Sequence, residues 1–295
     1  MGKSSKLSQA IVISVLIAIT ILVILPFVML VSISISNEQQ VVEYGYSIIP
    51  RGIDFSAYKY VLHNPETILR AYGVTATYSV VAMVLAVLFM AMLAYPLSKR
   101  DFKGKKTISF YVYFTMLFSG GLVPTYILIT EYLHLDDTLW VYILPGLISP
   151  WYVFMMRTFF QDIPYEISES ACIDGAGEYT IFFRMILPLS KPVLATVALF
   201  TFLAKWSDWY TAMLYINDDN LISLQYLLQR MMENITLLTT ISDSGGLAMT
   251  LSDVEIPSET VRMAMAVIVA GPALLIFPFF QKYFVKGLTI GSVKG

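Results

Sequence analysis

The sequence predicts an all-α membrane protein with six transmembrane helices. Of its 295 residues, 57% are hydrophobic and 14% are charged, whereas soluble domains carry about 25% charged residues. A bilayer-spanning helix needs about 20 mainly apolar residues. Six runs meet this need, and they lie near 11–33, 72–97, 107–129, 139–160, 193–215 and 261–284. We therefore expect a single transmembrane domain over 11–295, preceded by a short cytoplasmic N-terminus over 1–10.

The composition also argues against several functional classes. The formal net charge of −2 provides no basic field for nucleic acid. Cys172 is the only cysteine, so no intrachain disulfide can form. That cysteine with His63 and His134 does not make a typical zinc site. The sequence contains neither a complete phosphate-binding Gly-x-x-x-x-Gly-Lys-Ser/Thr loop nor a nucleophile elbow. We expect no enzyme activity, no metal and no cofactor bound by this chain.

The first apolar run has two interpretations. Lys3 and Lys6 precede it, and Ser32-Ile33-Ser34 resembles the cleavage site of a signal peptide. The run is nevertheless about 23 residues long, whereas the apolar region of a signal peptide has about 7–15. We favour an uncleaved membrane anchor over a signal peptide.

The distribution of basic residues predicts the orientation, because short cytoplasmic loops are rich in Lys and Arg. The connection between the second and third runs holds the densest basic cluster: Lys99, Arg100, Lys103, Lys105 and Lys106. Six spans then place both termini and the loop 161–190 in the cytoplasm. The segments 34–71 and 216–260 lie outside.

The loop 161–190 is acidic and polar between two apolar runs. Five acidic residues precede its first basic residue, Arg184: Asp162, Glu166, Glu169, Asp174 and Glu178. We expect one helix from Pro164 to Gly175 or Gly177, and a second from about Glu178 to near Pro188. An amphipathic helix lying on the membrane is the alternative, but such helices usually carry Lys and Arg toward anionic lipid. The acidity favours docking onto a protein, and the small Ser170 and Ala171 would let its surface come close.

The same loop resembles the EAA loop of ATP-binding-cassette importer permeases. The matching positions are Glu169, Ser170, Ala171, Asp174, Gly175, Leu187 and Pro188, with Ser170 where the family has Ala and Met185 where it commonly has Ile. The segments 120–126 and 286–295 resemble the carbohydrate-uptake branch, within it the oligosaccharide and polysaccharide permeases.

This resemblance implies the type I importer fold, with a cytoplasmic coupling helix between helices 4 and 5, in a bacterial plasma (inner) membrane. Two permease subunits would form one pathway, and two cytoplasmic ATP-binding-cassette subunits would use ATP and Mg. An extracellular or periplasmic solute-binding protein would deliver an oligosaccharide. The matching loop residues would contact the ATPase, and the rest of the chain would face membrane lipid and the second permease. The alternative is a secondary transporter or channel for a small polar solute, but the internal repeats that are common in such proteins are not apparent.

Two further segments are candidates for contacts with the substrate or the binding protein. Charged residues within a span are functional candidates by default, and Lys205 and Asp208 are spaced to pair on one helix face. The pathway candidates are Trp206, Ser207, Asp208 and Trp209, with Tyr126 and Tyr152 as weaker ones. The aromatic residues could equally form an interfacial belt or simple packing. In the segment 216–260 we expect an amphipathic helix near 221–238, either in contact with the binding protein or as an inert outer loop.

Overall fold

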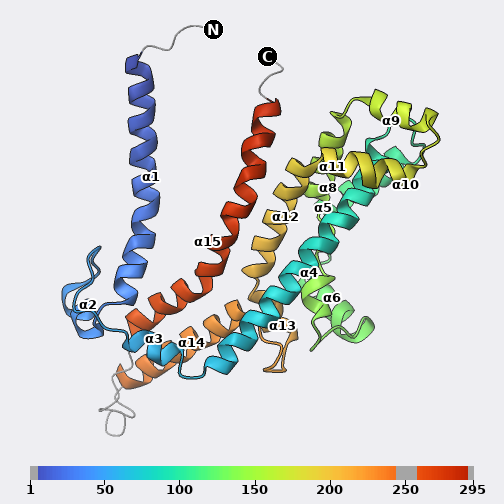
Figure 1. Ribbon diagram of the computed structural model, residues 1–295. Coiled ribbons are helices and arrows are strands. Elements are labelled where there is room, and N and C mark those ends of the chain that lie inside the picture. The colour runs from blue at the N-terminus through green and yellow to red at the C-terminus, as the bar shows by residue number, and fades with distance from the viewer. Residues whose placement is uncertain (1–5, 244–257, 292–295) are drawn as a thin grey trace. The chain divides into compact units, whose positions relative to one another are not determined.

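The computed structural model describes residues 6–243 and 258–291, which form helices and their connections and contain no strand. Figure 1 shows the helices in chain order. The chain divides into two compact units, one of Met1–Ile68 with Leu228–Pro272 and the other of Leu69–Leu227 with Ala273–Gly295. The expectations for 1–5, 244–257 and 292–295, at both ends of the chain and in the outer segment, fall outside the described residues.

The first unit contains α1 and the short helices that follow it. α1 (Lys6–Ser34) is exposed over almost its whole length, although it is the most apolar helix. α2 (Glu38–Tyr44) is preceded by its N-cap Asn37, whose side chain accepts from the backbone N–H of Gln40. α3 (Ser56–Val61) follows, and the unit is completed by parts of α14 (Leu224–Asp243) and α15 (Ser258–Gly291).

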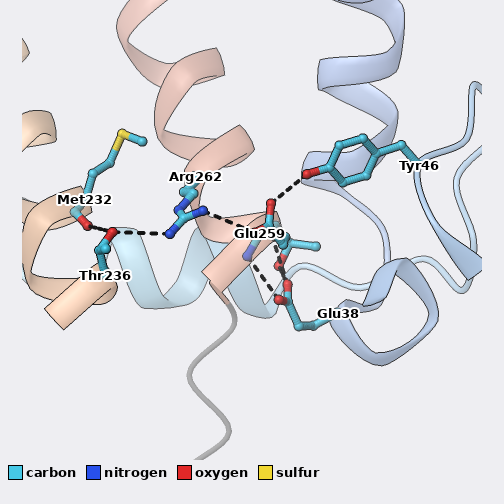
Figure 2. A network of polar contacts seen from close by, with 7 residues as sticks. Glu38, Tyr46, Met232, Thr236, Glu259 and Arg262 are labelled. Atoms are coloured by element: carbon cyan, nitrogen blue, oxygen red, sulfur yellow. Dashed lines mark hydrogen bonds and ion pairs between the residues drawn. The ribbon is translucent and has the colours of Figure 1, made fainter. Parts of the chain in front are cut away.

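A polar network closes the first unit at the start of α15, as Figure 2 shows. The carboxylate of Glu38 accepts from the backbone N–H groups of Glu259 (3.0 Å) and Thr260 (2.9 Å) and from the Thr260 hydroxyl (2.6 Å). Glu259 in turn accepts from the hydroxyl of Tyr46 at 2.7 Å and pairs with Arg262 at 3.1 Å. The first helical amides have no partner within their own helix, and their end of the helix dipole attracts negative charge. Glu38 thus caps α15.

The second unit is built on α4 (Pro65–Ser98). Its other helices, in chain order, are α5 (Lys105–Leu117), α6 (Leu122–Ile127), the π-helical turn η1 (Leu128–Tyr132), α7 (Trp140–Ile143), α8 (Pro150–Gln161), α9 (Tyr165–Ile173), α10 (Glu178–Ile181), the π-helical turn η2 (Phe182–Ile186), α11 (Leu187–Leu189), α12 (Lys191–Trp206) and α13 (Tyr210–Tyr215). Within this unit α9 and α10 lie at the upper end in Figure 1, and α6 and α13 lie at the lower end.

Small side chains seat α4 in the core of the second unit. Ala82, Ala86, Ala91 and Ala94 are at most 1% exposed. Without a hydrophobic driving force inside lipid, small residues favour helix contact because they let backbones approach closely. One core cluster joins the C-terminal half of α4 to α8, α9, the α10–η2 segment and α12. Another surrounds Tyr78 and Tyr142.

Two described helices, α1 and α4, are long and apolar enough to cross a membrane alone; the number rises to four if two bent pairs each count as one span. α1 and α4 cover the first two predicted spans. The six-span count remains a prediction. The helix predicted near 221–238 is confirmed as α14, which begins at Leu224 and continues to Asp243. Its location outside the membrane remains a prediction.

The third, fourth and fifth apolar runs are not continuous helices, contrary to expectation. The third run bends by 115° between α5 and α6, where Gly121 has a φ of 86°. The fourth is broken between Ile143 and Pro150, around Pro145 and Gly146 (φ 72°). The fifth stops at Trp206 and resumes at Tyr210. Gly and Pro interrupt helices for conformational reasons, and membrane proteins tolerate such breaks where the freed backbone groups find partners.

Candidate functional site

The acidic loop 161–190 folds into two short helices, as its sequence predicts. α9 begins at Tyr165, one residue later than expected, because Pro164 keeps an extended ψ of 128°. Gly175, at φ 79°, reverses the chain, whereas Gly177 has an ordinary φ of −74°. The N–H of Ala176 donates to the carbonyl of Ala171 at 2.9 Å across this turn. Gly175 is therefore the left-handed stop.

The two small residues of the loop face in different directions. Glu169, Ser170 and Asp174 are exposed. Ala171 is 3% exposed and packs in the core cluster that contains Ile181 and Phe182. The expectation that both small residues open the surface to a partner is therefore wrong for Ala171. Its size is required by internal packing, which fixes the first helix of the loop on the second.

The second half of the loop leads directly into the next span. α10, η2 and α11 run from Glu178 to Leu189, with Phe182 and Ile186 buried. Pro188 is exposed and Leu187 is half-buried. The chain then bends by 79° into α12. The surface of the loop carries apolar side chains that are exposed to solvent, among them Ile173 (81% exposed) and Tyr179 (79%).

A basic partner for the acidic loop comes from the connection after α4. Glu178 accepts from the hydroxyl of Tyr95 at 2.8 Å and forms an ion pair with Lys99. The Lys99 ammonium also lies 4.8 Å from the centre of the Tyr95 ring, and the Arg100 guanidinium lies 5.9 Å from that of Tyr165. The hydrogen bond from Lys99 is the largest effect and lowers the pKa of Glu178. Burial opposes it, and the hydrogen bond from Tyr95 lowers the pKa again, so the net change is a decrease.

The two connections line one cavity of about 790 Å³. Its walls include Lys99, Arg100 and Lys105 from the basic side, and Glu166, Glu169 and Glu178 from the acidic side. The connection after α4 and the loop after α8 thus meet at one end of the second unit. The sequence predicts that both lie on one side of the membrane, but it does not predict that they touch, because they are about 80 positions apart.

The predicted pathway residues of the fifth run do not converge. Trp206 is buried against Phe202 and Tyr72, with ring centres 5.5 and 6.3 Å apart. Ser207 is exposed at the end of α12, and Trp209 is half-buried at the start of α13. The carboxylate of Asp208 accepts from the N–H and the hydroxyl of Thr211, at 3.0 and 2.7 Å. Asp208 therefore holds the first turn of α13.

Lys205 does not pair with Asp208 in the way its spacing suggests. The i, i+3 rule needs a continuous helix, and α12 ends between the two residues. The ammonium of Lys205 instead donates to the carbonyls of Tyr142 (2.6 Å) and Pro145 (3.1 Å), at the break of the fourth run. The Tyr78 hydroxyl donates to the Lys205 carbonyl at 3.0 Å, and the Tyr78 ring stacks on Tyr142 with centres 4.2 Å apart.

The remaining candidates take part in aromatic packing. Tyr126 stacks on Tyr215 at 5.5 Å, and Tyr152 stacks on Phe200 at 6.5 Å. Sequence reasoning missed Tyr78, Tyr95 and Tyr142, which stand in apolar runs without a local mark of function. The Pro145-Gly146 pair was the available signal, because it marks a break whose carbonyls need a donor.

Comparison with known proteins identifies the family. The family model for a "Binding-protein-dependent transport system inner membrane component" matches residues 74–290. The chain belongs to this family. It is 41% identical to Protein LplC of Bacillus subtilis (strain 168) over 272 residues, which are 92% of this chain and 90% of that protein. It is 34% identical to the polygalacturonan/rhamnogalacturonan transport system permease protein YtcP of the same strain, over 99% of each chain.

Solved structures agree with the assignment. One chain of a bacterial ABC transporter involved in the import of the acidic polysaccharide alginate is 30% identical, with a TM-score of 0.78, and the match covers 96% of this chain and 99% of that one. The resemblance to importer permeases is thereby confirmed. The protein is a helical membrane subunit of an importer, and the alternative of a secondary transporter or channel is set aside.

Proposed function

We propose that this chain forms half of the translocation pathway of an ATP-driven oligosaccharide importer in the bacterial plasma (inner) membrane. The observation that carries the proposal is the matched family model together with relatives whose names specify polygalacturonan, rhamnogalacturonan and arabinooligosaccharide transport. A second permease subunit completes the pathway, and an extracellular or periplasmic binding protein delivers the sugar. Two cytoplasmic ATPase subunits bind and hydrolyse ATP with Mg.

The loop 161–190 is proposed as the contact with one ATPase subunit. Its exposed face combines the carboxylates of Glu169 and Asp174 with the apolar side chains of Ile173 and Tyr179. Interfaces of this kind bury aromatic and aliphatic anchors within a polar rim. Ser170, Leu187 and Pro188 complete the proposed contact, while Ala171 and Gly175 fix its shape from within.

The proposed orientation places both termini, the loop 161–190 and the basic connection after α4 in the cytoplasm, with six spans in total. The cavity that the two connections share supports their location on the same side of the membrane. The pathway residues remain proposals as well. Ser207, Trp209 and Tyr126 have solvent-accessible side chains that could contact the sugar. Trp206 packs in the core and Asp208 caps α13, so these two would only position the neighbouring pathway residues.

A single thiol can test both orientation and docking. Cys172 is exposed on α9 and is the only cysteine of the chain. A membrane-impermeant maleimide should label it in inside-out vesicles and not in intact cells. Addition of the ATPase subunits to the stripped vesicles should then protect it. Labelling from the outside would reverse the orientation, and labelling unaffected by the ATPase would refute docking at α9.

Copurification supplies an independent test with a matched control. Glu169→Lys reverses a charge on the proposed contact, so the tagged chain should lose its ATPase in mild detergent. Glu131→Lys makes the same change at an exposed position of η1, outside the loop 161–190, and should keep it. Equal ATPase recovery from both variants would contradict the docking role.

Uptake of labelled oligosaccharides by cells with and without the gene, from a panel that includes oligogalacturonate, tests the substrate class.

A further inference from the structure

We propose that α4 and α12 form a closed frame that moves as one body with the loop 161–190. This α4–α12 frame is tied at the loop by Glu178 with Tyr95 and Lys99, and at its far end by Tyr78 with Lys205. The inference rests on the proposed function, because it assumes that an ATPase moves the loop. It adds to the proposed ATPase contact two sets of side-chain contacts, one at each end of this frame.

The near tie joins the loop to the end of α4. Tyr95 lies in the last turn of α4, Lys99 follows the last residue of that helix, and both bind the same carboxylate oxygen of Glu178. The ring of Tyr95 also packs on Phe182, with centres 5.0 Å apart. A carboxylate with two donors and an adjacent ring contact is held in direction as well as in distance. A displacement of α10 therefore displaces the end of α4.

The two long sides of the frame are continuous helices. Between Tyr78 and Tyr95, α4 contains no proline; its two prolines are its first residue, Pro65, and Pro96. Seventeen residues at 1.5 Å each place the two tyrosines about 26 Å apart along the helix. α12 starts at Lys191, directly after the loop, and contains no break before Trp206. The loop is thus connected to the far end twice, through the backbone of α12 and through the side-chain tie to α4.

The far tie joins both sides to the breaks of the fourth and fifth runs. The Tyr78 hydroxyl binds the carbonyl of Lys205, and the Lys205 ammonium binds Tyr142 and Pro145. Tyr78 and Tyr142 are fully buried. Movement of packed helices as rigid bodies is one established form of conformational change. When both sets of contacts are formed, movement of the loop is transmitted to the helix breaks. When the contacts of Glu178 are broken, the loop can move without displacing α4.

A charge exchange at the near tie tests the frame. The complex with its ATPase subunits would be prepared with Cys172→Ser and Met213→Cys, which puts a single thiol on an exposed residue of α13 beyond the break. The maleimide labelling rate at position 213 is measured in the resting complex and after trapping with ATP and vanadate. The variants are Lys99→Glu, Glu178→Lys, both together, and Tyr95→Phe.

We expect trapping to change the labelling rate in the parent complex. Lys99→Glu, at a position outside the loop 161–190, should lose that change while the ATPase stays bound and hydrolyses ATP. Glu178→Lys should lose the change as well, and the double exchange should recover it. A purely structural role would instead lower complex yield and hydrolysis. The inference is overturned if the parent shows no change on trapping, if the single variants and Tyr95→Phe respond like the parent, or if the double exchange assembles without recovery. Absence of any ATPase from the parent complex would contradict the proposed function itself.

Discussion

The ammonium of Lys205 lies 2.6 Å from the carbonyl oxygen of Tyr142, so a charge at the end of α12 satisfies the broken backbone of the fourth apolar run. Carbonyl groups freed by a helix break within a membrane must find donors, because lipid supplies none. A charged residue in a span is first suspected of binding substrate. Here the donors of Lys205 are directed at backbone carbonyls.

Lys205→Met should destabilise the second unit. The apolar side chain leaves the carbonyls of Tyr142 and Pro145 without their donor, a loss of about 1–3 kcal/mol in the free energy of unfolding. Thermal unfolding of the purified chain in detergent measures the effect as a lower midpoint. Lys191→Met, at an exposed position on the same helix, is the control and should leave the midpoint unchanged. Equal midpoints for the two variants would show that these hydrogen bonds do not stabilise the break.

Asp208→Asn and Asp208→Ala should have different effects. Both carboxylate oxygens accept from Thr211, and an asparagine side chain can still accept from the backbone N–H at the start of α13. Loss of the cap in Asp208→Ala should cost about 1 kcal/mol of unfolding free energy. Oligosaccharide uptake should be retained in Asp208→Asn. A selective loss of uptake in that variant, at unchanged stability, would instead indicate a direct contact with the substrate.

Gly175→Ala should strain the turn in the loop 161–190. At φ 79° an alanine pays a conformational penalty of about 1 kcal/mol, although no atom lies within 4 Å of the added methyl group. Gly177→Ala is a matched control, since its surroundings are equally open and its φ is −74°. Amide hydrogen exchange of residues 165–176 should accelerate in the first variant and not in the second. Equal exchange in both would mean that the left-handed turn does not limit the stability of α9.

The Glu178 contact should weaken in acid. Because its pKa is lowered in the folded protein, its stabilisation is complete above the ordinary glutamate value of about 4.3 and is lost as pH falls through the lowered folded value. Exchange of amides in α10 should therefore rise between about pH 4.3 and the lowered value. Glu178→Gln should remove this dependence. Persistence of the same pH profile in that variant would assign it to another carboxylate.

Glu38→Ala should loosen the start of α15. The substitution removes three hydrogen bonds that cap the helix, which should cost about 1–2 kcal/mol. Exchange of the amides of Glu259 and Thr260 should accelerate, and the effect should be smaller in Glu38→Gln. Glu43→Ala, at an exposed position on α2, serves as the control. Unchanged protection at Glu259 and Thr260 in Glu38→Ala would contradict the capping role.

Local patterns in the sequence determined the protein class, the helical loop and the helix α14. Apolar run length identified membrane segments, the Pro164–Gly175 punctuation defined α9, and the spacing of apolar residues indicated α14. These signals are local, because helix initiation, helix termination and amphipathic faces depend on residues within a few positions of one another. The same locality explains the errors at Pro164 and within the apolar runs, where a strong hydrophobic signal concealed the breaks.

Only the tertiary structure decided which groups bind one another. Lys205 and Asp208 are three positions apart and separate across the end of α12, whereas Lys99 and Glu178 are far apart in sequence and form an ion pair. Ala171 lies within the motif and packs inward, while Ser170 beside it faces water. Contacts of this kind depend on how helices are placed by the packing of buried side chains, and that placement is a property of the whole fold and not of any short segment.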